Sequence, residues 1–436
     1  MTVRLLQPYN GQAVSTLYTG SDEAFLKATG VADDRTELAS DYRPSSPAAA
    51  SVLPGSQLAT GTGVKADGLV GSAAARADFL DFGGLGTPIN LRKWRKARAN
   101  VRAGLGNARV GYIGDSTTAM SVPGPRQKAF SAYVRDILKG RGLNARYSSI
   151  FGCSDKTSAT PAAYASYNPE VVMGAGWTFA SLSIGGQTFL AGTSVTSSTT
   201  WTPAETIDRF DVYYARAPGL AQFNLSVDGG AATAVDANGA SSMQKVTINA
   251  GSPGTHTLSI ARTGGGNLNI VGAIAYDSTK PAVEVLNLGL GSSTTEDWTD
   301  ASSYIRAFNV LPGLALDLGI IGLGINDRTP SYGPVPLATY ETNLRALVAK
   351  VRETGDAALM VPIPSSSSRQ ALAIQAQYDA VVRSVAKDLA CPLIDMAARW
   401  ESHSVSSDLG YYFDIVHSTA LGNADWAVPH ANLLLA

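Results

Sequence analysis

The sequence predicts an α/β core that is interrupted by an antiparallel β-sandwich. Before about residue 165 and after about residue 280, short apolar runs alternate with segments of helical periodicity, which is typical of a parallel sheet covered by helices. Between residues 166 and 280, alternating runs are separated by turns such as Asp228-Gly229-Gly230, as in antiparallel sandwiches. The length of 436 residues also favours more than one folded unit.

The chain divides into five predicted segments. The first is a separate N-terminal attachment piece with a short helix, and the second is a linker rich in Ser, Pro, Ala and Gly. The remaining three are the first part of the core, the inserted sandwich and the second part of the core. In order, the segments span residues 1–40, 41–88, 89–165, 166–280 and 281–436.

Helices and strands alternate in both parts of the core. The run 316–323 is apolar apart from Asp317, as expected for a strand buried on both faces of a parallel sheet. The expected helices span about 91–103, 127–139, 339–352 and 370–389, and the expected strands about 109–113, 283–288, 316–323 and 358–361.

Composition and charge exclude several classes of function. Hydrophobic residues make up 45% of the chain and charged residues 16%, as in folded proteins. The net charge of -1 does not favour a nucleic-acid partner, and we interpret the basic run 92–98 as the solvated face of a helix. Two cysteines, Cys153 and Cys391, form no disulfide framework or zinc motif. We find neither a signal peptide nor a membrane-spanning run, and expect no membrane partner.

Three short motifs carry residues suited to acyl transfer by serine, which needs an exposed hydroxyl, a base, a group that orients the base, and donors for the oxyanion. An Asp and a His three residues apart can meet across one turn, so that the carboxylate holds Nδ1–H and leaves Nε2 as the base. Each motif alone also fits a structural turn or cap. The motifs are Gly114-Asp115-Ser116, Gly324-Ile325-Asn326-Asp327 and Asp414-Ile415-Val416-His417.

Together and in this order, the motifs resemble the blocks of the SGNH or GDSL hydrolase family. The resemblance implies a three-layer α/β/α, flavodoxin-like core. It also implies that Ser116 is the nucleophile, that His417 is the general base and then the general acid, and that Asp414 orients His417. The Asn326 side chain and the Ser116 backbone N–H would donate to the oxyanion. No metal or organic cofactor is implied, and the other histidines (His256, His403 and His430) are interpreted as structural.

A third oxyanion donor is implied by the family's second block, an Asn-x-Gly-x-Ser-Gly pattern. The matching stretch here is Asn287-Leu288-Gly289-Leu290-Gly291-Ser292, which departs from that pattern. We expect the Gly291 N–H to be the donor, although a strict count from Asn287 gives Ser292. Asp115 and Asp327 are expected to be structural.

The predicted reaction is O-deacetylation of a carbohydrate such as bacterial surface polysaccharide. Accessory β-domains beside esterase cores often handle carbohydrate. Aromatic residues of the sandwich could stack on sugars, although packing is favoured for each of Trp177, Trp201, Tyr213 and Tyr214. The first residues resemble the start of some bacteriophage tail proteins, so we expect other virion proteins as partners and a location in the phage tail, or otherwise the cytoplasm. The alternatives are a general esterase or lipase, and a glycan-binding virion adsorption protein with an inactive core.

Overall fold

The computed structural model describes residues 90–119, 125–154 and 160–436, and the backbone of four short strands before them. These are β1 (Val3–Leu5), β2 (Leu17–Tyr18), β3 (Ala32–Asp33) and β4 (Leu80–Asp81). The remainder of the expected attachment segment and linker, including the helix expected near residues 22–30, lies outside the described residues.

A seven-stranded sheet forms the centre of the core, in the order β4-β21-β20-β19-β5-β18-β6. Every pairing is parallel except that of β4 with β21. The other six strands are β5 (Ala108–Gly114), β6 (Ala145–Arg146), β18 (Val283–Asn287), β19 (Leu318–Gly322), β20 (Asp356–Val361) and β21 (Leu393–Asp395). The predicted α/β class is confirmed.

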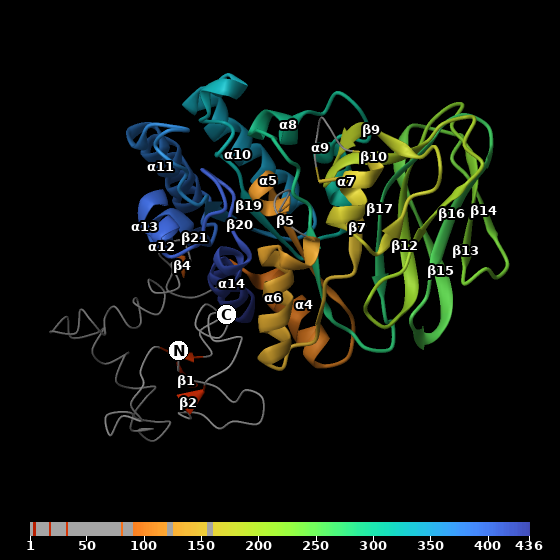
Figure 1. Ribbon diagram of the computed structural model, residues 1–436, viewed down its shortest axis with the longest axis horizontal. Helices are drawn as coiled ribbons and strands as arrows, with labels where there is room; N and C mark the ends of the chain where they lie inside the picture. Colours follow the sequence, from red (N-terminus) through yellow and green to blue (C-terminus); the bar gives the residue numbers. More distant parts are fainter. Residues whose placement is uncertain are drawn as a thin grey trace.

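Helices pack on both faces of this sheet and make three layers (Figure 1). Side chains of α4 (Arg92–Arg102), α6 (Phe130–Gly140), α12 (Met396–Trp400) and α14 (Ala420–Leu435) share one buried cluster with β5 and β18. Side chains of α10 (Leu337–Arg352), α11 (Leu372–Asp388) and the short α8 (Thr295–Thr299) and α9 (Ala307–Val310) belong to the cluster on the opposite face. None of the described helices combines the length and apolar character needed to cross a membrane.

The inserted region is a sandwich of two antiparallel sheets, seen on the right of Figure 1. Their strand orders are β15-β12-β17-β10-β9, with β7 (Ser149–Phe151) paired to β17, and β14-β13-β16-β11-β8. Between the sheets lies an apolar core rich in aromatic residues. The strands are β8 (Val171–Val172), β9 (Thr178–Ser183), β10 (Gly186–Ala191), β11 (Ser198–Trp201), β12 (Ile207–Arg216), β13 (Gln222–Val227), β14 (Thr233–Asp236), β15 (Ser242–Gly254), β16 (Leu258–Gly264) and β17 (Leu268–Tyr276).

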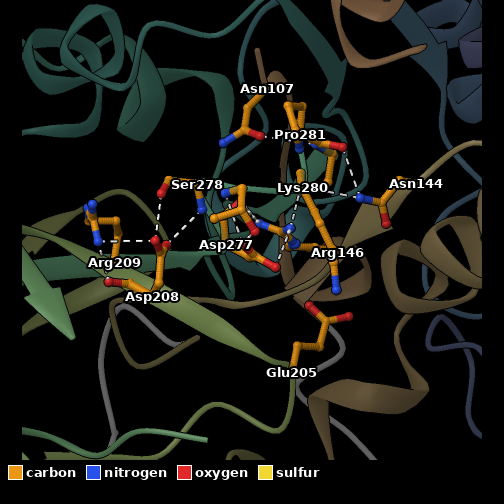
Figure 2. Close-up of polar contacts among 12 residues, drawn as sticks. Asn107, Asn144, Arg146, Glu205, Asp208, Arg209, Asp277, Ser278, Lys280 and Pro281 are labelled. Atoms are coloured by element: carbon orange, nitrogen blue, oxygen red, sulfur yellow. Dashed lines mark hydrogen bonds and ion pairs between the residues drawn. The ribbon is translucent and has the colours of Figure 1, made fainter. Parts of the chain in front are cut away.

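Residues 277–282 connect the last sandwich strand, β17, to the core strand β18, and polar contacts hold this connection from both sides (Figure 2). From the core, the Arg146 guanidinium donates to the Asp277 carbonyl oxygen at 3.1 Å. From the sandwich, the Asp208 carboxylate accepts hydrogen bonds from the Ser278 backbone N–H at 2.7 Å and its hydroxyl at 2.5 Å. The connection is thus fixed to both regions.

Candidate active site

Ser116 stands where a central parallel strand ends and a helix begins. Strand β5 ends at Gly114, and the short helix α5 (Ser116–Ala119) begins at Ser116. A Cβ at Gly114 would clash with the Thr118 hydroxyl and lie 3.0 Å from the Gly322 carbonyl oxygen, so the absence of a side chain here allows the close turn. The buried Asp115 carboxylate caps the turn by accepting the Thr117 backbone N–H at 2.9 Å and hydroxyl at 2.7 Å. The carboxyl edge of a parallel sheet is the usual place for a site.

The structure brings Ser116, His417 and Asp414 into one hydrogen-bonded relay. Ser116 Oγ lies 2.9 Å from His417 Nε2, and His417 Nδ1 lies 2.7 Å from Asp414 Oδ2. The other carboxylate oxygen of Asp414 accepts the backbone N–H groups of Val416 at 2.8 Å and His417 at 2.7 Å. With the Nδ1 proton held by the carboxylate, Nε2 is free to take the serine proton.

The hydrogen bonds to Asp414 also favour its charged form. Burial alone would raise the pKa of this carboxyl, but the hydrogen bonds from the backbone and side chain of His417 and from the Val416 N–H lower it below its usual value. Asp414 therefore stays ionised at neutral pH. An ionised carboxylate stabilises the imidazolium that forms when His417 takes a proton.

Asn326 lies beyond the end of the neighbouring strand, β19, and is 2% exposed. Its Nδ2 donates to the Ser293 carbonyl oxygen at 2.9 Å, and its Oδ1 accepts from Arg369 Nη2 at 3.0 Å. An amide nitrogen carries two hydrogens. One is held by Ser293, and the second can therefore serve as an oxyanion donor.

The second block corrects our expectation for Gly291. The Gly291 N–H already donates to the Ser154 carbonyl oxygen at 2.9 Å, so it is not available to an oxyanion. The Ser292 N–H has no main-chain acceptor among the described residues, and Ser292 has a φ of 62°. Left-handed backbone is strained for a residue with a Cβ, and such strain gathers at functional sites. The strict count along the motif, which gives Ser292, is thus the better guide.

Two buried carboxyls lie next to the reacting groups in the sequence. Asp327 Oδ1 accepts the Thr295 backbone N–H at 2.8 Å and hydroxyl at 2.5 Å, just as Asp115 is bonded by Thr117. Burial raises the pKa of Asp327 to about 6, although the hydrogen bonds from Thr295 oppose the rise. Within the described residues, the Oδ2 atoms of both carboxyls are buried without a hydrogen-bond partner. Both side chains tie turns together, as the sequence suggested.

The motifs did not reveal two further neighbours of the site. Arg369, which contacts Asn326, follows four serines and belongs to no motif. Tyr332, whose hydroxyl donates to Ser292 Oγ at 3.3 Å, is 43% exposed. No sequence signal distinguished either residue, because each reaches the site only through the fold.

The aromatic residues considered for sugar stacking are buried in the sandwich or at its contact with the core. Trp177, Trp201, Tyr213 and Tyr214 are at most 8% exposed, so packing explains all four.

The histidines outside the relay are hydrogen-bonded or buried. His256 bonds Asp228 at 2.6 Å, His403 bonds the Asp414 carbonyl oxygen at 3.1 Å, and His430 is fully buried. In the part of the chain that the structure describes, no group of three or more His, Cys, Asp or Glu could hold a metal ion.

Comparisons with known proteins bear on the fold and on the motifs that follow the sandwich. The model of the GDSL-like lipase/acylhydrolase family matches residues 246–424, which contain Asn326, Asp414 and His417 but not Ser116. A peptidoglycan O-acetylesterase structure is similar with a TM-score of 0.59 and 19% identity over 78% of this chain and 94% of that chain. An acetylxylan esterase from Geobacillus stearothermophilus has a TM-score of 0.29 and 21% identity over 35% of this chain and 73% of its own.

Among curated proteins, none matches the sequence. The structural similarity at 19% identity concerns the fold, and the family match adds the motifs that follow the sandwich. The chain has the SGNH hydrolase fold, and its residues 246–424 match the model of the GDSL-like lipase/acylhydrolase family.

Proposed function

We propose that this chain is a serine esterase that removes O-acetyl groups from a carbohydrate such as bacterial surface polysaccharide. The observation that carries the proposal is the relay from Ser116 through His417 to Asp414, with distances of 2.9 and 2.7 Å. Its atoms come from segments 301 residues apart in the sequence. A hydroxyl, an imidazole and a carboxylate in this order are the parts that nucleophilic acyl transfer requires.

The first half of the reaction forms an acyl-enzyme. Ser116 Oγ attacks the ester carbonyl carbon, its proton passes to His417 Nε2, and the carbonyl π electrons move onto the oxygen. That oxyanion accepts hydrogen bonds from Asn326 Nδ2 and from the backbone N–H groups of Ser292 and Ser116. The intermediate then expels the sugar oxygen, which takes the proton from His417 and leaves as a hydroxyl group.

The second half releases acetate. A water molecule gives a proton to His417 Nε2 as its oxygen attacks the acyl carbon, and a second oxyanion forms in the same place. When this intermediate collapses, the bond from the acyl carbon to Ser116 Oγ breaks and the serine recovers its proton from His417. Acetic acid forms and ionises at neutral pH.

The surface beside the loop that carries Ser292, here called the oxyanion loop, favours a carbohydrate substrate over the lipid ester of the lipase alternative. A hollow there is lined by Thr294, Glu296, Asp297, Asp300 and Tyr332. Carboxylates and hydroxyls suit a hydroxyl-rich ligand, whereas a long acyl chain needs apolar walls. A similar fold in a peptidoglycan O-acetylesterase also supports an acetylated glycan as the substrate class.

The assembled relay argues against the alternative of an inactive core that only adsorbs to glycan, because an inactive core would not need to keep these distances.

We also propose, from the sequence alone, that residues 1–40 attach the chain to other virion proteins. That segment lies outside the described side chains. Loss of virion incorporation when residues 1–40 are deleted would test this part separately.

The enzymatic proposal is tested by comparing p-nitrophenyl acetate, butyrate and octanoate as substrates, and by measuring acetate released from an O-acetylated polysaccharide. We expect the acetate ester to be cleaved fastest, and Ser116→Ala to lose about 10⁴-fold or more of kcat. Ser241→Ala, at an exposed serine of the inserted region, is the matched control and should keep the wild-type rate. Equal rates for wild type and Ser116→Ala would refute the proposal.

A further inference from the structure

We propose that Arg369 is a positioning residue that orients and polarises the Asn326 carboxamide as an oxyanion donor. The inference rests on the proposed esterase function and adds to it a residue outside every motif. Arg369 lies between strand β20 and helix α11, in a turn that follows the run of four serines.

Arg369 and Ser293 hold the Asn326 amide from opposite sides. Arg369 Nη2 donates to Oδ1 at 3.0 Å, and Nδ2 donates to the Ser293 carbonyl oxygen at 2.9 Å. A guanidinium has only donors and a carbonyl oxygen only accepts. If the amide turned over, Nδ2 would face the guanidinium and Oδ1 would face the carbonyl, and both bonds would be lost. The two partners therefore fix which atom of Asn326 donates.

The charge of Arg369 strengthens that donor. A cation bonded to Oδ1 withdraws electron density from the amide and makes its remaining N–H a better donor to an oxyanion. The Arg369 charge also acts on Asp115, which precedes the nucleophile. Burial raises the pKa of the Asp115 carboxyl, and Arg369 is among the groups that oppose this rise. A positive charge close to the developing oxyanion is expected to favour the transition state.

The segment that leads into the Arg369 turn is anchored at two points. The Ser365 N–H donates to Gln375 Oε1 at 3.0 Å, and Gln375 Nε2 returns a bond to the Ser365 carbonyl oxygen at 2.8 Å. The Ser366 N–H donates at 2.9 Å to the carbonyl oxygen of Ile415, within the motif that carries His417. Arg369 thus connects the loop of the base with the oxyanion donor, on a support that is ordered before substrate binds.

Kinetics of Arg369→Met and Arg369→Lys on p-nitrophenyl acetate test the inference. We expect Arg369→Met to lower kcat by about 10- to 100-fold, less than the loss of a whole donor, with KM changed less than about twofold. Arg369→Lys keeps a charge and should recover part of the rate. Arg102→Met, at an exposed arginine of α4, is the matched control and should keep the wild-type kcat.

A double-mutant cycle with Asn326→Ala shows whether Arg369 acts through Asn326. If it does, Arg369→Met costs little more once Asn326 is already replaced by alanine, so the two losses are not additive. Fully multiplied losses, or an Arg369→Met enzyme with wild-type kcat, would overturn the inference.

A second readout does not depend on esterase activity. In protein labelled with [¹⁵N]asparagine, the Asn326 side-chain resonance is identified by its loss in Asn326→Ala. It should shift in Arg369→Met and stay in place in Arg102→Met. An unchanged resonance in Arg369→Met overturns the positioning role, whereas an inactive wild type with a shifted resonance overturns only the proposed function.

Discussion

The buried carboxyls at the active site and in the sandwich differ in the partners that surround them. Asp211 of the sandwich is 1% exposed, and its Oδ2 lies 3.4 Å from Arg109 of the core strand β5. Two residues of the sandwich strand β15 also contact this carboxylate: Lys245 lies 3.0 Å from Oδ2, and Thr247 donates to Oδ1 at 2.6 Å. Asp115 and Asp327 at the site are bonded instead by the uncharged Thr117 and Thr295, and among the described residues each leaves one oxygen buried without a hydrogen-bond partner.

Buried carboxyls thus have two roles in this molecule. Where the sandwich contacts the core, at Asp211 and Arg109, paired charges hold the two regions together, and removing one partner leaves the other charge uncompensated. At the site, single carboxyls hold two turns beside the nucleophile and the oxyanion donor at a cost in stability. Strain of this kind is common where function constrains the sequence.

After Ser116→Ala, the largest expected effect comes from Asp414→Asn. The amide introduced by this substitution would donate to His417 Nδ1 rather than accept from it, which places the proton on Nε2 and blocks the base. We expect kcat to fall by about 10⁴-fold while the urea unfolding midpoint changes little. Steady-state kinetics with p-nitrophenyl acetate measure the loss. A kcat within about tenfold of wild type would mean that catalysis does not depend on the hydrogen bond between Asp414 and His417.

The sequence predicted those elements of the fold whose residues show a regular hydrophobic pattern. The strand at 318–322 and the helix at 337–352 were expected within two residues, because a buried parallel strand and an amphipathic helix have strong periodicity. Helix α14 (Ala420–Leu435) was not expected, since it contains Gly422 and Pro429 and is buried almost all round. Such a helix has no amphipathic pattern.

The same reasoning applies to the site. Ser116, Asn326 and the Asp414–His417 pair each lie in a short motif, so local sequence identified them. The choice between Gly291 and Ser292 needed the hydrogen bond from Gly291 to Ser154, a contact between segments that lie far apart in the sequence. Arg369 needed the packing of its turn, because an arginine after a run of serines carries no signal of its own.

The next effect in size is expected where the sandwich contacts the core. Asp211→Ala removes the partner that Arg109 and Lys245 share, although Glu284 still pairs with Arg109 at 2.5 Å. Because Glu284 remains, we expect a loss of about 3 kcal/mol of unfolding free energy, the low end for a broken buried pair. Urea unfolding measures it. Asp236→Asn on the exposed strand β14 is the control and should change the unfolding free energy by less than about 0.5 kcal/mol.

Asp327 should make stability depend on pH in the opposite sense to a paired carboxylate. Its folded-state pKa of about 6 is raised above the ordinary 3.8, so the folded protein binds more protons between these values. Stability therefore falls as pH rises through this window, by about 2 kcal/mol between pH 4.5 and 7. In Asp327→Asn this contribution should vanish. Urea midpoints at the two pH values, compared with wild type, test it; an identical pH dependence in both proteins would contradict the raised pKa.

The smallest effect is expected at Ser292, and it sharpens the assignment of the oxyanion loop. Ser292→Gly keeps the backbone N–H and relieves a φ of 62°. Relief of about 1 kcal/mol is partly offset by the greater freedom of glycine in the unfolded chain, so we expect a net gain of about 0.5 kcal/mol. Because the donor is main chain, kcat should stay within about threefold of wild type. A loss of about 100-fold, the size expected for a missing oxyanion donor, would show that the Ser292 hydroxyl, held by Tyr332, takes part in the reaction.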